Sequence, residues 1–315
     1  MTTAAHEHAA LTSAGLAKRA ALASVGTALF LLLMKAAASW QTGSVAMLGS
    51  LADTGLDLLA SLISLYGIHV AAQPADREHR FGHGKAEALA ALVQVGIIGV
   101  SAVAIGWRAV SRLLAGTTTA KAEFGIGVSL VAIAATFALL FYQRRVIART
   151  GSVAIRTDHV HYQSDLLLNL SVIAALVLDQ YAGFSGADPL LGIAIALWLA
   201  WGAWRASAHA VDQLMDKEWP DERRQHFIAI ARRHPDLKGV HELRTRTSGS
   251  QDFAQFHIWV DPTMTVRRAH AVMDEIEAEL AQEFPDVEIL IHLDPEGHVD
   301  PPTIAPAPDG SRIAS

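Results

Sequence analysis

The chain has 315 residues, of which 51% are hydrophobic and only 18% are charged, and its mean hydropathy of +0.29 is too high for an ordinary soluble protein of this size. Its formal charge of -6 offers no basic surface for nucleic acid, so we predict no nucleic-acid partner. Because the sequence contains no cysteine, disulfides, thiolate zinc sites and redox chemistry on thiols are excluded, and a bound metal needs His, Asp or Glu ligands.

Six stretches are long and apolar enough for a helix that crosses a bilayer, which takes about 20 residues. They are Leu16–Ala38, Ser44–Ala71, Ala86–Leu114, Phe124–Tyr142, His161–Tyr181 and Pro189–His209. From Asp212 onward the sequence is charged and periodic, like a soluble domain. We therefore predict a tail over 1–15, a six-helix transmembrane domain over 16–211, a small α/β domain over 212–297 and a disordered, Pro-rich tail over 298–315.

The basic residues beside the spans predict the orientation of the chain, because Lys and Arg accumulate on the cytoplasmic side of a membrane. An even number of spans places both ends of the chain on one side. Nine basic residues flank the spans on that side and three on the other, so both termini are expected in the cytoplasm. The nine are Lys18, Arg19, Arg77, Arg80, Lys85, Arg144, Arg145, Arg149 and Arg156, and the three are Arg108, Arg112 and Lys121.

Two pairs of metal-binding side chains interrupt these apolar stretches, Asp53 with Asp57 and His161 with Asp165. Residues four apart share one face of a helix, so each pair can bind one ion and the two pairs can converge. Carboxylates at membrane depth cost about 3 kcal/mol each, which an ion or proton pathway usually explains. They can instead be hydrogen-bonded to neighbouring helices. The nearest cation is Lys35, which we expect to reach the outer membrane surface, so an external cation is the simpler counter-charge.

Three carboxylates and one imidazole suit several divalent metals, including zinc, cadmium, ferrous iron, cobalt and manganese, without selecting one. The same groups bind protons, and a metal can bind only after they have lost them. If such a site opens to one side of the membrane at a time, it exchanges a cytoplasmic metal for external protons.

A third group of possible ligands lies in the loop after the second span, where Asp76, His79 and His83 follow an i, i+3, i+7 pattern. A helix would align the three side chains, although Pro74 and two glycines disfavour one. The pattern is as typical of a charged loop with solvated histidines as of a metal site.

The soluble domain reads as helix, strand, strand, helix, strand, which predicts an open-faced α/β sandwich. The first helix starts near Pro220, a hairpin turn joins VHELRTRT to FAQFHIWV, the second helix runs from about Val266 to Phe284, and VEILIHLD is the last strand. Strand alternation places His257 and the pair His292 and Asp294 on the faces opposite the apolar residues. His241 begins the first strand and His270 lies in the second helix, so five possible metal ligands come from four elements.

The chain resembles the cation diffusion facilitator family, specifically its bacterial zinc and ferrous-iron efflux branch. The resemblance rests on ADTGLD, QPADREHRFGHGKAEALAAL, HYQSD, GVHELRTRTSG and IHLDP, which together cover most of the chain. It implies a homodimeric metal–proton antiporter of the bacterial inner membrane, with six transmembrane helices and a metallochaperone-like, ferredoxin-like cytoplasmic domain that binds metal and dimerises.

The resemblance also implies roles for individual residues. The transport site is Asp53, Asp57, His161 and Asp165, and a loop site is Asp76, His79 and His83. A binuclear zinc site near the cytoplasmic dimer interface is His241, His257, His270, His292 and Asp294, and an inter-domain charge interlock is Lys85 with Asp216. Many zinc-restricted relatives have His at the position of Asp53, so Cd²⁺, Fe²⁺ and Mn²⁺ stay open as substrates beside Zn²⁺.

Two other classes of function fit parts of the pattern. A membrane-anchored metal sensor or storage protein would hold the same metals as structural ions. An intramembrane metalloenzyme would need an open coordination position and a general base, and the sequence has no HExxH motif. It also has no GxxxxGK[ST] motif for ATP. We therefore predict a secondary active transporter, not an enzyme, with divalent metal ions, protons and the lipid bilayer as its partners.

Overall fold

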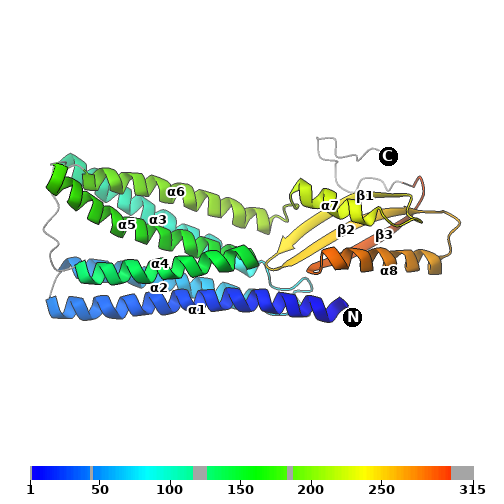
Figure 1. The fold of residues 1–315 in the computed structure, drawn as a ribbon, viewed down its shortest axis with the longest axis horizontal. Coiled ribbons are helices and arrows are strands. Elements are labelled where there is room, and N and C mark those ends of the chain that lie inside the picture. Colours follow the sequence, from blue (N-terminus) through cyan, green and yellow to red (C-terminus); the bar gives the residue numbers. More distant parts are fainter. Residues whose placement is uncertain (1, 43–44, 116–125, 183–186, 299–315) are drawn as a thin grey trace. The chain divides into compact units, whose positions relative to one another are not determined.

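The computed structural model describes residues 2–42, 45–115, 126–182 and 187–298 (Figure 1). The chain divides into two compact units, one of residues 13–214 and one of residues 215–315 with 1–12. The first is made of helices and the second mixes helices with a sheet. We refer to them as the membrane unit and the cytoplasmic unit.

The described residues of the membrane unit form six long helices, the first of which extends beyond it toward the N-terminus. They are α1 (Thr2–Thr42), α2 (Val45–Ala71), α3 (Ala86–Ala115), α4 (Ile126–Thr150), α5 (Val153–Ala182) and α6 (Ala187–Leu214). In the described residues, all but α5 contain a stretch apolar enough to span a membrane. The helix α5 has 30 residues, several of them in its apolar second half outside the described side chains, and it packs against α2, α3, α4 and α6.

Two helices start earlier in the chain than we predicted. The helix α1 begins at Thr2, although we expected a tail over 1–15, because the alanine-rich start of the chain favours helix. The helix α5 begins at Val153 instead of His161. His161 therefore lies inside α5 rather than at its end.

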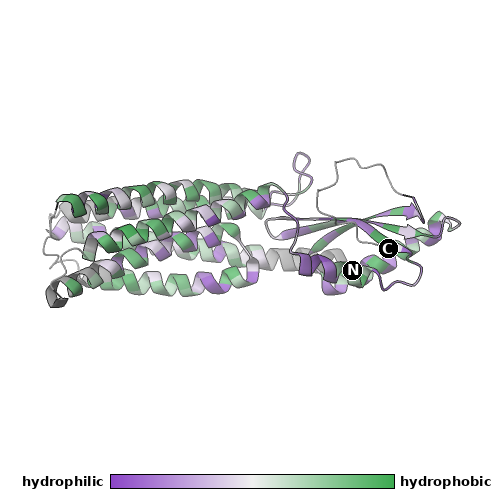
Figure 2. Cartoon of the chain, turned by 90° about the horizontal axis from the view of Figure 1, so that it is seen from above, coloured by the Kyte–Doolittle hydropathy of each residue, from purple (hydrophilic) through white to green (hydrophobic). Residues whose placement is uncertain are grey.

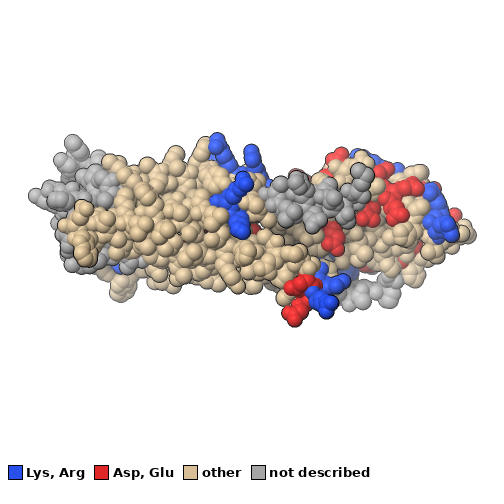
Figure 3. Space-filling model, turned by 90° about the horizontal axis from the view of Figure 1, so that it is seen from below, with Lys and Arg blue, Asp and Glu red and all other residues tan. Residues whose placement is uncertain are grey.

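The interior of the membrane unit is filled by small and polar side chains, while many large apolar side chains face outward. Alanines, serines and glutamines are buried there, including Ala20, Ala154, Ser61 and Gln143. Figure 2 shows that hydrophobic residues predominate along these helices, and Figure 3 shows a face of them with few charged residues except at one end. This distribution is typical of a helical bundle surrounded by lipid.

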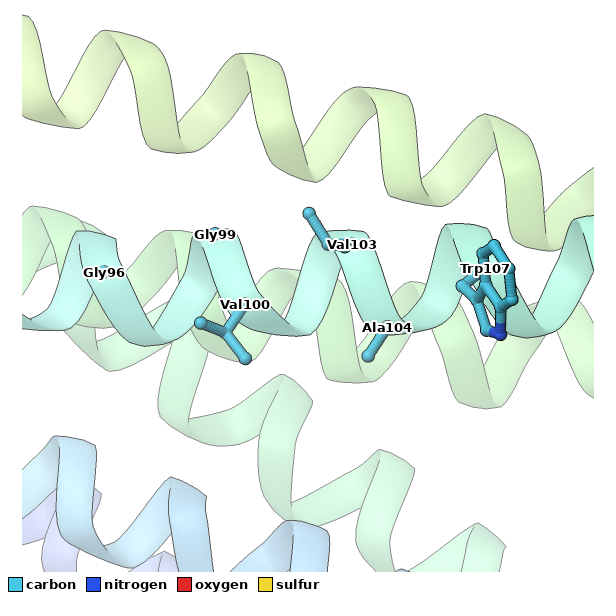
Figure 4. Close-up of a pocket in the computed structure, with 6 residues that line it drawn as sticks. All are labelled: Gly96, Gly99, Val100, Val103, Ala104 and Trp107. Atoms are coloured by element: carbon cyan, nitrogen blue, oxygen red, sulfur yellow. The ribbon is translucent and has the colours of Figure 1, made fainter.

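One groove of 610 Å³ on the outer side of α3 is lined by residues of that helix alone (Figure 4). Its lining carries no carboxylate or imidazole, so the groove is a feature of the apolar surface and not a metal site. The lining residues are Gly96, Gly99, Val100, Val103, Ala104 and Trp107.

The cytoplasmic unit has the predicted order of elements. They are α7 (Asp221–Ala231), β1 (Gly239–Ser248), β2 (Gln251–Val260), α8 (Val266–Glu283) and β3 (Val287–Pro295). A tight turn at Gly249, where φ is 63°, joins β1 to β2 as an antiparallel hairpin. The helix α8 crosses back so that β3 pairs with β2 in parallel, and the strand order is β1-β2-β3.

The core of the cytoplasmic unit lies between the sheet and the two helices. Phe227 of α7, Phe256 of β2 and Ile276 of α8 are almost completely buried in one cluster. The helix α7 contacts β1 and α8 contacts β3, so one face of the sheet is covered. The strand residues that alternate away from this core are left to build a site, as the period of two predicts.

Candidate metal centres

The interior of the membrane unit brings together Asp57 of α2 with His161 and Asp165 of α5. Nε2 of His161 lies 3.0 Å from Oδ1 of Asp57 and 4.0 Å from Oδ2 of Asp165. The side chain of His161 is 6% exposed, against 18% for Asp57 and 27% for Asp165. One donor atom from each residue falls within 4.8 Å of the others, which is close enough to hold one ion.

Asp53 is outside this group of donors, although we predicted it as a fourth ligand. Its side chain is exposed, one turn before Asp57 on α2. Lys35 is also placed differently from our prediction: it is half-buried, and its ammonium group donates to the Thr54 hydroxyl at 2.6 Å instead of reaching the membrane surface. A fixed positive charge therefore lies beside the turn of α2 that carries Asp53.

Hydrogen bonds within α5 support the two ligands of that helix. The Ser164 hydroxyl donates to the carbonyl oxygen of His161 at 2.6 Å, and the Asn169 amide donates to that of Asp165 at 2.7 Å. Such bonds loosen the local helical ladder and are frequent where a helix bends or carries a site.

Sequence reasoning missed a buried polar cluster around Asp158 of α5. Asp158 is completely buried, and its Oδ2 accepts a hydrogen bond from the Gln143 amide of α4 at 2.8 Å. The signal was present in the sequence, because Asp158, His161 and Asp165 follow the i, i+3, i+7 spacing of one helix face. We had placed the start of the span after Asp158.

The loop between α2 and α3 brings Asp76, His79 and His83 together through a turn, not through the helix that the spacing required. Each imidazole lies 3.4 Å from an Asp76 oxygen, and the two rings are 4.5 Å apart. Oδ1 of Asp76 also accepts the backbone N–H groups of Glu78 and His79. The bond from His79 is the main reason that the pKa of Asp76 lies below its usual range, which keeps this carboxylate ionised.

The third centre surrounds Asp294 at the end of β3. The carboxylate of Asp294 lies 2.8 Å from Nδ1 of His257 and 3.1 Å from Nε2 of His241. The strand register explains why these three side chains lie close together. His241 pairs with His257, and Trp259, two residues further along β2, pairs with Asp294. A bulge follows His241, where Glu242 has φ of 50°, so β1 bends at this point.

The charges of this centre suit a metal ion. Burial opposes ionisation of Asp294, but the hydrogen bond from His257 and the charges of His257, His292 and His241 together outweigh it and hold the pKa of Asp294 below its usual range. Burial lowers the pKa of His241, which favours its neutral form. Nδ1 of His241 is buried and has no hydrogen-bond partner in the described part of the chain. A neutral imidazole with an unshared nitrogen lone pair is a metal ligand.

Two predicted ligands of this centre lie apart from the group of three. His292 is 60% exposed, with Nε2 at 3.4 Å from Oδ1 of Asp294 and its ring 4.6 Å from that of His257. His270 is exposed on α8 and pairs with Asp274 at 3.2 Å. The described chain therefore assembles three of the five predicted donors, with His292 at the edge.

Comparison with known proteins places both units in one family. Residues 21–215 match the family described as "Cation efflux transmembrane domain", and residues 219–296 match "Cation efflux protein, cytoplasmic domain". The chain belongs to the cation efflux family. Proteins of this family are transporters, so the predictions of a transporter instead of an enzyme, and of a helical membrane region with a small cytoplasmic α/β domain, are confirmed.

Several curated relatives of this cation efflux protein are similar over most of its length. The "Cation-efflux pump FieF" of Serratia proteamaculans (strain 568) is 42% identical over 282 residues, which are 90% of this chain and 94% of the relative. The protein of the same name from Yersinia pestis (strain Pestoides F) is 42% identical over 278 residues, 88% of this chain and 92% of the relative. Among solved structures, the "Metal-bound C-terminal domain of CzcD transporter from Thermotoga maritima" is 30% identical, covers 25% of this chain and 93% of that chain, and has a TM-score of 0.24.

The predicted interlock between Lys85 and Asp216 joins residues of different units, and it stays a prediction. Within the membrane unit, the Lys85 ammonium donates to the carbonyl oxygen of Leu214 at 3.1 Å, at the end of α6. Within the cytoplasmic unit of this cation efflux protein, Asp216 lies 3.8 Å from Arg246. A Lys at a helix C-terminus is favourable, because the helix dipole is negative there.

Proposed function

We propose that this cation efflux protein is a proton-coupled antiporter that exports divalent transition metals from the cytoplasm across the bacterial inner membrane. Zinc is the proposed main substrate, with cadmium, ferrous iron and manganese as further ones. The group of Asp57, His161 and Asp165, contributed by two helices of an apolar bundle, carries this proposal. The relatives named as cation-efflux pumps support export as the direction of transport.

The charges of the site explain why metal and protons would exchange. Two carboxylates with a neutral imidazole balance one divalent cation, so the loaded site is close to neutral inside the membrane. After the metal leaves, the carboxylates Asp57 and Asp165 lose that balance, and two protons restore it. Because His161 must be neutral to coordinate, protons and metal compete for the same nitrogen and oxygen atoms. A site open to one side at a time then couples the two flows.

The other two centres are proposed to sense or hold metal on the cytoplasmic side. Asp76, His79 and His83 form the loop site, and His241, His257 and Asp294 form the inner part of the cytoplasmic site. His270 and His292 remain proposed ligands of a binuclear site in a homodimer, whose second subunit would complete it. Asp53, as a fourth transport ligand that binds the metal more weakly than the other three, and the Lys85–Asp216 interlock belong to the same proposal. Metal at these sites would tie the geometry of the dimer to the cytoplasmic metal concentration.

Metal flux into proteoliposomes tests the proposal directly. Purified protein is reconstituted, a pH gradient is imposed, and uptake of Zn²⁺, Cd²⁺, Fe²⁺ and Mn²⁺ is compared with uptake when a protonophore removes the gradient. We expect gradient-driven uptake, and its loss in Asp165→Ala without loss of folding. Metal binding without any gradient-driven flux in the wild type would instead support a sensor or storage protein. An Asp53→His variant shows whether that carboxylate sets the choice of metal.

A further inference from the structure

Asp158 lies in a closed network of buried polar groups that is separate from the metal ligands. Its Oδ2 accepts from Nε2 of Gln143, and the same nitrogen donates to the Ser24 hydroxyl at 3.0 Å. Its Oδ1 lies 3.4 Å from the Ser61 hydroxyl, which in turn lies 2.9 Å from the Tyr162 hydroxyl. All five side chains are at most 1% exposed, and they come from α1, α2, α4 and α5.

The number of hydrogen atoms in this network limits which group can donate in each contact. The Tyr162 hydroxyl has one hydrogen, and it donates to the carbonyl oxygen of Ser24 at 3.1 Å, because a carbonyl can only accept. The Ser61 hydrogen then points to the Tyr162 oxygen, and the 3.4 Å contact between Ser61 and Oδ1 of Asp158 takes its hydrogen from a protonated Asp158. If Tyr162 donates to Ser61 instead, the Ser61 hydroxyl donates to an ionised Asp158, so the network accommodates both states of this carboxyl group.

The rest of the network agrees with a protonated Asp158. The two hydrogens of the Gln143 amide go to the Ser24 hydroxyl and to Oδ2 of Asp158, and the Ser24 hydrogen goes to the carbonyl oxygen of Ala20 at 3.2 Å. In the protonated form, Oδ2 accepts from Gln143 and Oδ1 donates to Ser61, while the Gln94 amide donates to Oδ1 over a longer distance of 3.5 Å. Every hydrogen of these groups is used once.

In the described part of the chain no Lys or Arg bonds Asp158, and the imidazole of His161, the nearest possible counter-charge, is itself held by Asp57 and Asp165. The groups that face it from α1 to α4 are neutral: Ser24, Ser61, Gln94 at 3.5 Å, and Gln143. On its own helix the titratable neighbours are His159, whose Nδ1 bonds Oε1 of Gln143 at 3.1 Å, His161, which is engaged by Asp57, and Tyr162. An unpaired carboxylate at membrane depth costs about 3 kcal/mol or more, whereas the acid is neutral.

Asp158 shares a face of α5 with the ligands His161 and Asp165, so a movement of α5 that opens the metal site also affects the network. Its partners belong to α1, α2, α3 and α4, and a shift of α5 against them would break the closed set of bonds. Once water reaches Asp158, its carboxylic acid ionises near neutral pH, because an aspartate in water has a pKa of about 3.9.

We propose that Asp158 is a second proton-binding residue of the transport cycle. It takes a proton from external water, holds it in the arrangement described here, and releases it to cytoplasmic water when α5 shifts. This inference rests on the proposed antiport, and it adds a carried proton to those displaced at the metal ligands. Asp158 binds the proton without coordinating the metal.

The test counts protons and zinc in the full-length protein in proteoliposomes, with Asp158→Asn as the variant. Asparagine keeps the size and the hydrogen-bonding capacity of the side chain but cannot release a proton. We expect zinc affinity close to that of the wild type and about one proton fewer exchanged for each zinc ion. The matched control is Glu87→Gln, which neutralises another buried carboxylate, bonded by the Ser152 hydroxyl at 2.8 Å. We expect this control to keep the wild-type ratio.

The outcomes separate this inference from the proposed function. A wild type whose zinc flux ignores the pH gradient overturns the antiport. A coupled wild type with the same proton-to-zinc ratio in Asp158→Asn overturns the inference alone. If Asp158→Asn does not fold, infrared spectroscopy of the metal-free variant Glu87→Gln/Asp57→Asn/Asp165→Asn provides a second test, because Asp158 is then the buried carboxyl group left in the described part of the membrane unit. The carbonyl band of a buried carboxylic acid must then be present, and its absence overturns the inference.

Discussion

Replacing Asp57 with asparagine removes one negative charge from the proposed transport site and keeps the size of the side chain. Its oxygen lies 3.0 Å from the His161 imidazole, and the two side chains are only 18% and 6% exposed. Removal of one partner from a buried charged pair costs about 3–5 kcal/mol. Since 1.4 kcal/mol is a factor of ten, the affinity for zinc should fall by about 100-fold to a few thousand-fold. Asp53→Asn should reduce it by less than about tenfold, because Asp53 is exposed and outside the group of donors.

Zinc uptake into proteoliposomes over a wide range of zinc concentrations measures this difference, because only the transport site carries flux. The proposed cytoplasmic centre would bind zinc too, so total binding would not separate the sites. We expect the concentration for half-maximal uptake to rise strongly in Asp57→Asn and slightly in Asp53→Asn. Equal losses in the two variants would refute the three-donor geometry, and unchanged uptake in Asp57→Asn would refute the site itself.

Three further predictions concern packing, pH and the cytoplasmic centre. Gly67→Ala should destabilise the membrane unit by about 1–3 kcal/mol, because the new methyl group would lie 2.3 Å from a side chain of α3. Gly96→Ala, whose methyl group meets nothing within 4 Å, is its control, and equal melting temperatures would contradict the close helix approach. The hydrogen bond from His234 holds the pKa of Glu275 below its ordinary value of 4.5. The ionised Glu275 therefore stabilises the folded state above pH 4.5, and this contribution is lost as the pH falls. Urea denaturation should show Glu275→Gln to be less stable than the wild type at neutral pH and equally stable in acid. Zinc at 100 times its dissociation constant should stabilise the cytoplasmic unit by about 2.7 kcal/mol. Thermal melts should show this gain lost in His257→Ala and only partly lost in His270→Ala, and the same loss in both would argue against the group of three.

The cytoplasmic unit was well predicted because its patterns are local. The helix α8 was expected from about Val266 to Phe284 and ends at Glu283, since its apolar face repeats with the helical period. The start of α5 was missed for the opposite reason. Hydropathy counts Arg156 and Asp158 as costs in lipid, but it does not register the buried partners on other helices that satisfy Asp158.

The metal sites were predicted as far as spacing on one element allows. The spacing of four residues placed Asp53 and Asp57 on one face of α2. It could not show that Asp53 is exposed, because exposure depends on how the helices pack. Alternation along the strands indicated His257 and Asp294. It says nothing about the direction of a helical side chain such as His270, which turns to Asp274 within one chain.

The proposed transport site is divided between two helices, and this division has a mechanical consequence. Asp57 reaches it from α2 and His161 with Asp165 from α5, so a bound ion works as a removable cross-link between α2 and α5. The transported ion is then also the group that holds α2 and α5 together. The separation of the two helices should report occupancy in each turnover, and a pair of spin labels on α2 and α5 would measure the transported ion without contacting it.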